Sequence, residues 1–195
     1  IVSDDSSSDG TLNLLKKNRH LYDILVENSH NLGKGHAIIN CIDKIKGDYV
    51  LIQDADLEYD PNDYKDLFFP AQNLNADVVF GSRFHGKGAK RILYFKNRIA
   101  NFFLSLIVSV LTNINFSDVE TGYKLIKSNI FKSLNLKEKT FAIEIEITMK
   151  LLKKKIKFYE VGISYNGRTY EEGKKIKFKD GIIALYKIFF YKFFN

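Results

Sequence analysis

Two aspartates stand two residues apart at the end of a short apolar run. The run covers residues 49–52, and Gln53-Asp54-Ala55-Asp56 follows it directly. An apolar run of this length predicts a buried strand, and side chains at positions i and i+2 of extended chain project to the same side. Oxygen ligands in this arrangement suit Mg²⁺ or Mn²⁺, ions that usually also hold a substrate phosphate. The alternative is a solvated turn at a strand end, where aspartate is common.

A second acidic string lies near the start of the sequence. Residues 4–11 read Asp-Asp-Ser-Ser-Ser-Asp-Gly-Thr and follow the apolar pair Ile1-Val2. A carboxylate at such a strand end can accept hydrogen bonds from a ribose or from a nucleobase N–H. A polar loop that ends in a helix cap explains the same string equally well.

The charge balance points to anionic partners. The net charge of the 195 residues is +7, which favours nucleic acid, an anionic membrane surface or phosphorylated substrates. Nucleic acid is the weakest of these, because it calls for one coherent basic face without metal-type carboxylates. The single cysteine, Cys41, excludes a disulfide framework and a cysteine zinc site. No apolar stretch reaches the roughly 18–20 residues of a spanning helix.

Apolar segments of strand and helix character alternate along the chain. We expect strands near residues 1–3, 22–26, 49–53, 76–80, 123–126 and 158–164. We expect helices over residues 11–17, 33–45, 91–111 and 141–152, one that begins at Pro61, and a last one at the end of the chain. Alternation of this kind predicts an α/β fold with parallel βαβ units. We divide the chain into one domain, residues 1–172, and a C-terminal appendage, residues 173–195.

Several strings resemble, in order and spacing, the motifs of family 2 glycosyltransferases with the GT-A fold. They are residues 4–11, Asn31-Leu32-Gly33-Lys34-Gly35-His36-Ala37, residues 53–61 with the DxD pair, and Gly81-Ser82-Arg83-Phe84. Residues 118–124, 141–146 and 165–174 are similar to the dolichol-phosphate mannose synthase and polyprenyl-phosphate glycosyltransferase branch. The resemblance covers essentially the whole chain. It implies a Rossmann-like, mixed and mostly parallel sheet flanked by helices, and it leads us to expect that the family's first strand is missing here and the nucleotide pocket incomplete.

The resemblance also implies a reaction and its residues. A nucleoside diphosphate sugar, GDP-mannose or a UDP-sugar, would give its sugar to a polyprenyl (dolichyl or undecaprenyl) phosphate with inversion, in a metal-dependent hexosyl transfer. Asp54 and Asp56 would hold Mg²⁺ or Mn²⁺, and Asp5, Gln53 and Asp54 would bind the donor nucleotide. The acceptor phosphate would be bound by Arg83, Arg98, Arg168 and Lys174. The catalytic set would be Asp118, Arg83 and Arg168, with Asp118 either a base or a group that orients an arginine or the acceptor.

The last helix and two glutamates complete the sequence-based expectations. Residues 182–194 are aromatic-rich with interspersed lysines, which is typical of a helix lying in a membrane interface. We therefore expect a cytoplasmic protein that is peripheral on the membrane or anchored to it; self-association stays open. Glu144 and Glu146 would point about 200° apart on a helix and so form no acid/base pair.

Two other functions fit the same motifs. One is a family 2 enzyme acting on a saccharide hydroxyl, which would need a firm general base. The other is a non-catalytic domain that binds nucleotide sugars.

Overall fold

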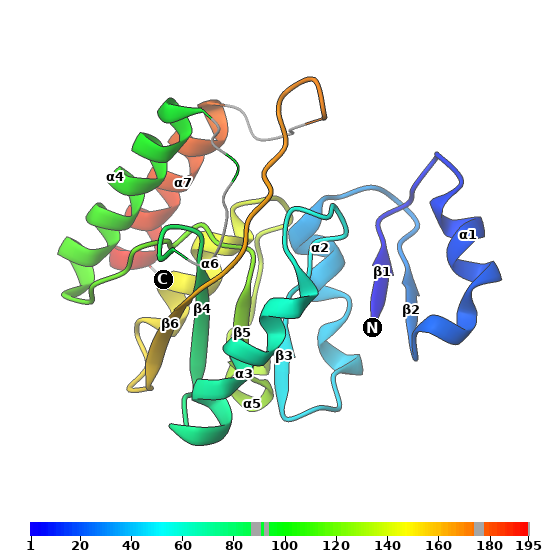
Figure 1. Ribbon diagram of the computed structural model, residues 1–195, viewed down its shortest axis with the longest axis horizontal. Helices are drawn as coiled ribbons and strands as arrows, with labels where there is room; N and C mark the ends of the chain where they lie inside the picture. The colour runs from blue at the N-terminus through cyan, green and yellow to red at the C-terminus, as the bar shows by residue number, and fades with distance from the viewer. Residues whose placement is uncertain (87–90, 92–93, 174–177, 195) are drawn as a thin grey trace.

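The strands form two sheets in a computed structural model that describes residues 1–86, 91, 94–173 and 178–194. In the smaller sheet, β1 (Val2–Asp4) pairs in parallel with β2 (Leu25–Glu27). The larger sheet has the order β3 (Tyr49–Leu51), β5 (Lys124–Lys127), β4 (Val78–Ser82), β6 (Phe158–Gly162). Figure 1 places β1 and β2 beyond the β3 edge of this sheet.

One strand of the larger sheet runs against the others. β5 is antiparallel to both of its neighbours, with Ile126 opposite Val50 of β3 and Val78 of β4. β4 and β6 are parallel. Because β3 and β4 both oppose β5, the strands β3, β4 and β6 share one direction. This is the mixed, mostly parallel sheet expected from the sequence.

The central strand β4 is buried on both faces, so it separates two cores. Val78 and Phe80 face a core built with α4 (Phe95–Thr112), α6 (Ile143–Leu151) and α7 (Phe178–Phe193). Val79 faces the other core, which includes α3 (Tyr64–Asn73). Figure 1 shows α3 in front of the sheet, with α4 and α7 together at one end of the molecule. Because both faces of β4 are covered, its apolar residues form a continuous run and do not alternate with polar ones.

The remaining helices are short. They are α1 (Thr11–Lys17), α2 (Lys34–Ile39), α5 (Ser128–Lys132) and the 3₁₀ turns Arg19–Leu21, Ile42–Lys44 and Pro61–Asp63. The expected helix over residues 33–45 was wrong in its length, since α2 ends at Ile39 and a 3₁₀ turn follows. The Asn40 side chain donates to Asn28 Oδ1 at 2.8 Å, and isoleucine and asparagine are weak helix formers. The apolar face of this segment still packs on the core.

The C-terminal helix α7 packs on α4 and α6 through one stripe. Ala184, Ile188 and Tyr191 on this stripe are buried in the same core as Val78. The division of the chain at residue 173 stays a prediction. Across the described ranges, no helix combines the length and the apolar character needed to cross a bilayer.

Candidate active site

The acidic loop that follows β3 turns sharply and gathers three carboxylates. Leu57 has a left-handed backbone with φ 59°, between Asp56 and Glu58. The loop begins at Gln53, whose Oε1 accepts from Tyr64 at 2.9 Å and also from Tyr123. The side chain of Gln53, predicted to bind the donor nucleotide, therefore anchors the start of this loop.

A lysine from α2 neutralises Asp54. Lys34 Nζ lies 2.7 Å from Asp54 Oδ1 and 2.8 Å from Glu144 Oε1 of α6. Burial by itself lowers the pKa of Lys34, but the carboxylates of Glu144 and Asp54 outweigh it and raise that pKa. Lys124 of β5 also pairs with Glu144, and the two lysines hold the pKa of Glu144 below its usual value against the effect of burial.

An arginine from the segment after β6 covers Asp56. Arg168 Nη2 lies 2.7 Å from Asp56 Oδ2, and Arg168 Nε lies 3.0 Å from Glu58 Oε1. The pKa of Asp56 is raised, first by burial and also by the charge of Glu58, whereas Arg168 lowers the pKa of Glu58 despite burial. An added positive charge beside Asp56 would therefore favour its ionised form.

The donor atoms suit a hard divalent cation. Asp54 and Asp56 offer carboxylate oxygens, and both side chains are partly exposed. Within the described part of the chain, no group of three or more histidine, cysteine, aspartate or glutamate side chains is arranged to hold a metal ion. Mg²⁺ commonly takes one or two protein carboxylates and completes its shell with water and substrate phosphate, so this pair fits such an ion.

Asp118 and Arg83 form a buried, bidentate ion pair. Arg83 Nε donates to Asp118 Oδ2 and Arg83 Nη2 to Oδ1, each at 2.7 Å, and the Arg83 backbone N–H also donates to Oδ2 at 3.1 Å. Asp118 is fully buried. A carboxylate that holds an arginine fork in this way favours the orienting alternative for Asp118 over the role of base.

Tyr165 connects the two arginines that the motifs singled out. The Arg83 guanidinium lies 5.3 Å from the centre of the Tyr165 ring. The Tyr165 hydroxyl donates to Glu58 Oε2 at 3.0 Å, and Glu58 in turn binds Arg168. Arg83 and Arg168 therefore approach the acidic loop from β4 and from the segment after β6.

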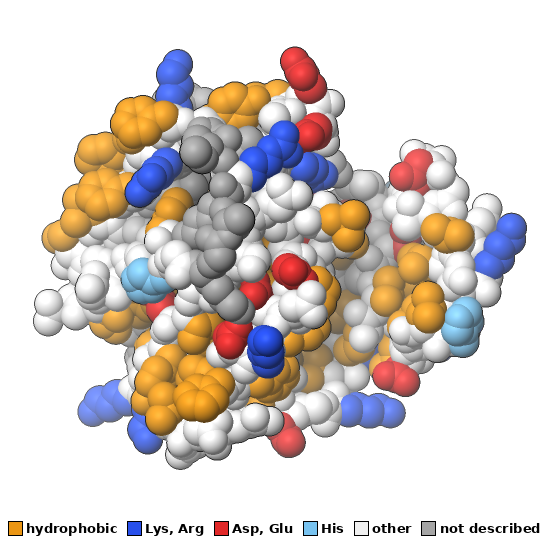
Figure 2. Space-filling model, viewed as in Figure 1, with side chains coloured by type: hydrophobic (Ala, Val, Ile, Leu, Met, Phe, Trp, Pro, Cys, Tyr) orange, Lys and Arg blue, Asp and Glu red, His pale blue; other side chains and the backbone are white. Residues whose placement is uncertain are grey.

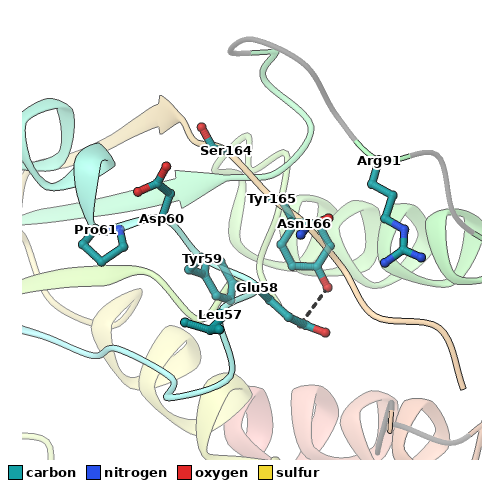
Figure 3. A pocket seen from close by; sticks show the side chains of 9 residues that line it. All are labelled: Leu57, Glu58, Tyr59, Asp60, Pro61, Arg91, Ser164, Tyr165 and Asn166. Atoms are coloured by element: carbon teal, nitrogen blue, oxygen red, sulfur yellow. Dashed lines mark hydrogen bonds between the residues drawn. The ribbon is translucent and has the colours of Figure 1, made fainter. Parts of the chain in front are cut away.

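A cavity of about 570 Å³ opens beside this connection. It is lined by residues 57–61, Arg91 and residues 164–166. Figure 3 shows the Tyr165 hydroxyl directed at Glu58, with Arg91 extending from a neighbouring segment. Arg91 also pairs with Glu172 at 2.7 Å, which ties the segment after β6 to the region before α4.

Two predicted substrate-binding residues, Arg98 and Asp5, lie apart from this cluster. Arg98 is exposed in the first turn of α4, and no described residue forms an ion pair with it. Lys174 lies outside the described residues. Asp5 accepts from the backbone N–H groups of Leu32 and Gly33, at 3.1 and 2.6 Å, and from Asn28. These bonds lower the pKa of Asp5 although burial opposes them, so its carboxylate organises the loop before α2.

The two glutamates of α6 have separate partners, as their spacing predicted. Glu144 faces the lysines of the site, whereas Glu146 accepts from the backbone N–H groups of Lys137 and Glu138 and pairs with Lys150. The sequence interpretation gave no role to Lys34, Glu58 or Tyr165. A signal for Glu58 exists, because it continues the i, i+2 alternation of Asp54 and Asp56.

Glu120 forms no ion pair with any residue that the structure describes. Its Oε1 atom is buried and has no hydrogen-bond partner among the described residues. Burial raises the pKa of Glu120 to about 7; Lys124 and Arg83 lower it, and Glu144 and Asp118 raise it further. Glu120 is therefore partly protonated near neutral pH.

Replacing Glu120 by glutamine is expected to stabilise the protein at alkaline pH. A carboxyl whose pKa is raised on folding stabilises the native state below its unfolded pKa, and this contribution is lost as the pH rises through the folded value. The Glu120→Gln variant should gain up to about 3 kcal/mol over the wild type at about pH 8 and nothing near pH 4.5. Urea unfolding across this range measures the difference. Glu171→Gln, an exposed control, should follow the wild type, and an equal gain at both pH values would contradict the assignment.

Comparison with known proteins gives a family match and several relatives. The family model described as "Glycosyl transferase family 2" matches residues 1–135. The chain is 29% identical over 193 residues to uncharacterized protein MJ0544 of Methanocaldococcus jannaschii, covering 90% of this chain and 82% of that protein. It is 24% identical to the low-salt glycan biosynthesis hexosyltransferase Agl6 of Haloferax volcanii, covering 93% of this chain and 43% of Agl6. It is 29% identical to the glycosyltransferase AglJ of the same organism, covering 86% and 54%. The chain thus spans about half the length of the two Haloferax relatives.

Solved structures share the fold. Glucosyl-3-phosphoglycerate synthase from Mycobacterium tuberculosis, in complex with Mn²⁺, UDP-glucose and phosphoglyceric acid, superposes with a TM-score of 0.71 at 13% identity, covering 98% of this chain and 67% of that one. The same protein in complex with Mg²⁺ and UDP gives a TM-score of 0.69 at 14% identity, with 98% and 67% covered.

Proposed function

The chain belongs to glycosyl transferase family 2 and has the GT-A fold, and from this we propose that it transfers a sugar from a nucleoside diphosphate sugar to a polyprenyl phosphate. The observation that supports this most is the loop that carries Asp54 and Asp56, both partly exposed, because Arg168 binds Asp56 and Glu58 on it and Tyr165 links Glu58 to Arg83. Carboxylates suit a metal-bound diphosphate, and guanidinium forks suit a phosphate monoester.

On the donor side, the leaving group is a diphosphate that gains negative charge as the bond to the sugar breaks. Asp54 and Asp56 would hold a Mg²⁺ or Mn²⁺ ion, which supplies charge stabilisation to that leaving group. Lys34 lies between Asp54 and Glu144, so it adds a positive charge to the same wall of the site. The synthase from M. tuberculosis has been crystallised with these ions and a UDP-sugar, which supports a donor of the same class.

On the acceptor side, Arg83 and Arg168 would hold a phosphate. A phosphate monoester has its second pKa near 6, so at neutral pH it is mostly a dianion and needs little help from a base. This agrees with the engagement of Asp118 by Arg83, since a carboxylate in a bidentate pair is poorly placed to take a proton. Asp118 then acts as the group that aims Arg83.

The lipid part of the proposed acceptor is supported by an apolar surface on the two packed helices α4 and α7. Figure 2 shows orange side chains gathered over α4. The exposed apolar residues of α4 include Phe95, Ile99, Phe102, Phe103, Leu106 and Val110. Those of α7 include Ile182, Ile183, Tyr186, Phe189 and Phe193. Exposed apolar side chains on two helices that pack together fit a membrane interface, where a peripheral protein would meet a lipid phosphate.

Acceptor selectivity tests the proposal. Full-length protein with Mn²⁺ is incubated with GDP-, UDP- or dTDP-hexoses and one of three acceptors, namely a short-chain polyprenyl phosphate, the matching polyprenol without phosphate, or 3-phosphoglycerate. We expect release of nucleoside diphosphate and formation of a glycolipid with the polyprenyl phosphate only, and loss of turnover when the metal is chelated. Turnover with phosphoglycerate alone would replace the lipid acceptor by a soluble phosphate, and no release with any pair would overturn the proposed transfer.

A further inference from the structure

Two positions at the start of α2 must be glycine, because a segment about a hundred residues further along the sequence packs against them and leaves no room for a Cβ atom. A Cβ atom on Gly35 would lie 2.0 Å from the carbonyl oxygen of Glu138. Gly33 has φ +102°, and a Cβ there would lie 2.8 Å from the carbonyl oxygen of Lys139. The backbone N–H of His36 donates to that same Lys139 oxygen at 3.0 Å. Residues 33–36 and 138–139 are therefore locked together, backbone against backbone.

The start of α2 carries groups of the donor side. Lys34, between the two glycines, reaches Asp54 and Glu144. The backbone N–H groups of Leu32 and Gly33 hold Asp5. Any shift of residues 138–139 would therefore move the cation beside the DxD pair and the donors that fix Asp5 at the same time.

The other side of that segment is tied to the C-terminal helix. Glu138 Oε1 accepts from Lys187 Nζ at 2.5 Å and from the Tyr191 hydroxyl at 2.8 Å, both from α7. Tyr191 is buried, and burial together with Glu138 raises its pKa, so the phenol keeps its proton and stays a donor. The backbone N–H of Glu138 is held by Glu146 of α6 at 2.7 Å.

We propose that Glu138 is a positioning residue for the donor site, through which α7 fixes the placement of Lys34 and Asp5. The side-chain carboxylate of Glu138 binds α7, and its backbone carbonyl oxygen packs directly against Gly35. A hydrogen bond to a charged group is stronger than a neutral one, and here two converge on one oxygen. The inference rests on the proposed function, because it assigns the residues around Lys34 and Asp5 to the donor.

The variants Tyr191→Phe, Lys187→Met and their double variant test this link. They remove both donors to Glu138 and leave the α7 stripe apolar. Lys187 also lies over the Tyr186 and Phe190 rings, and methionine keeps an apolar side chain there. The probes are GDP and UDP with Mn²⁺, measured by calorimetry, and hydrogen–deuterium exchange of the nucleotide-free protein. The double variant is expected to raise the dissociation constant at least about tenfold and to speed exchange of the amides in residues 32–36. Lys192→Met, a control on the same helix, should change neither quantity.

The alternative is that Glu138 only anchors α7 to the domain, and it predicts different results. If the double variant loses thermal stability but keeps both wild-type nucleotide affinity and wild-type exchange in residues 32–36, Glu138 only anchors α7 and the proposal is overturned. A rise in the acceptor KM with an unchanged donor KM would also contradict it. If the wild type binds no nucleoside diphosphate, the proposed function fails, and the exchange of residues 32–36 still decides whether α7 controls that segment.

Discussion

Replacing Asp56 by asparagine is expected to lower the transfer rate by at least about a hundredfold while leaving the fold as stable as before. The rate falls because an amide is a far weaker ligand for a hard divalent cation than a carboxylate. Stability is kept because burial and the charge of Glu58 raise the pKa of Asp56. The native state therefore favours the protonated form of Asp56 over the ionised form. Above the folded pKa this carboxyl is ionised, so its contribution to the stability of the wild type is already lost and asparagine removes nothing further. Initial rates with Mn²⁺ and urea unfolding at about pH 7 measure the two effects.

A matched control lies on the same loop. The Asp60 side chain accepts from the backbone N–H of Asn62 at 2.9 Å and caps the turn Pro61–Asp63. Asparagine caps helices as well as aspartate does, so Asp60→Asn should change neither rate nor stability appreciably. If Asp56→Asn kept more than about a tenth of the wild-type rate, the assignment of Asp56 to a metal would be wrong. A large loss of stability would instead mean that its pair with Arg168 matters mainly to the fold.

The positions of the candidate residues could be predicted from the sequence better than their partners. The run before Asp54 located a strand end, and the i, i+2 spacing placed two carboxylates on one loop. No local pattern gave the cation beside each of them, because Lys34 belongs to α2 and Arg168 to the segment after β6. Pairing between distant segments depends on the packing of the whole domain, which periodicity and propensity do not encode.

The same limit applies to the partner of Asp118 and to the length of α2. The motifs identified both Asp118 and Arg83 and left open whether Asp118 is a base or orients an arginine or the acceptor, and the fold brings the two residues into one bidentate pair. The apolar period over residues 33–45 predicted the buried face correctly. It did not predict the end of α2 at Ile39, because the Asn40 side chain is held by Asn28 on a different segment.

Replacing Asp118 by asparagine is expected to lower the free energy of unfolding by about 3–5 kcal/mol. Asp118 is fully buried and the Arg83 side chain is only 12% exposed, so the variant leaves a nearly buried guanidinium without its bidentate partner. Urea unfolding measures the loss. In the double variant Arg83→Met with Asp118→Leu the charge and its partner are both gone, and it should recover most of the stability. A similar loss in both variants would show that the site requires the charges themselves.

Kinetics of the same variants separate the two roles considered for Asp118. If Asp118 aims Arg83 at the acceptor phosphate, Asp118→Asn and Arg83→Met should each raise the acceptor KM, and their combination should cost little more than either alone, because both remove one interaction. If Asp118 is instead the base for a saccharide hydroxyl, Asp118→Asn should lower kcat at an unchanged acceptor KM and add to the effect of Arg83→Met. The bidentate geometry leads us to expect the first pattern, and the additive one would exclude the orienting role.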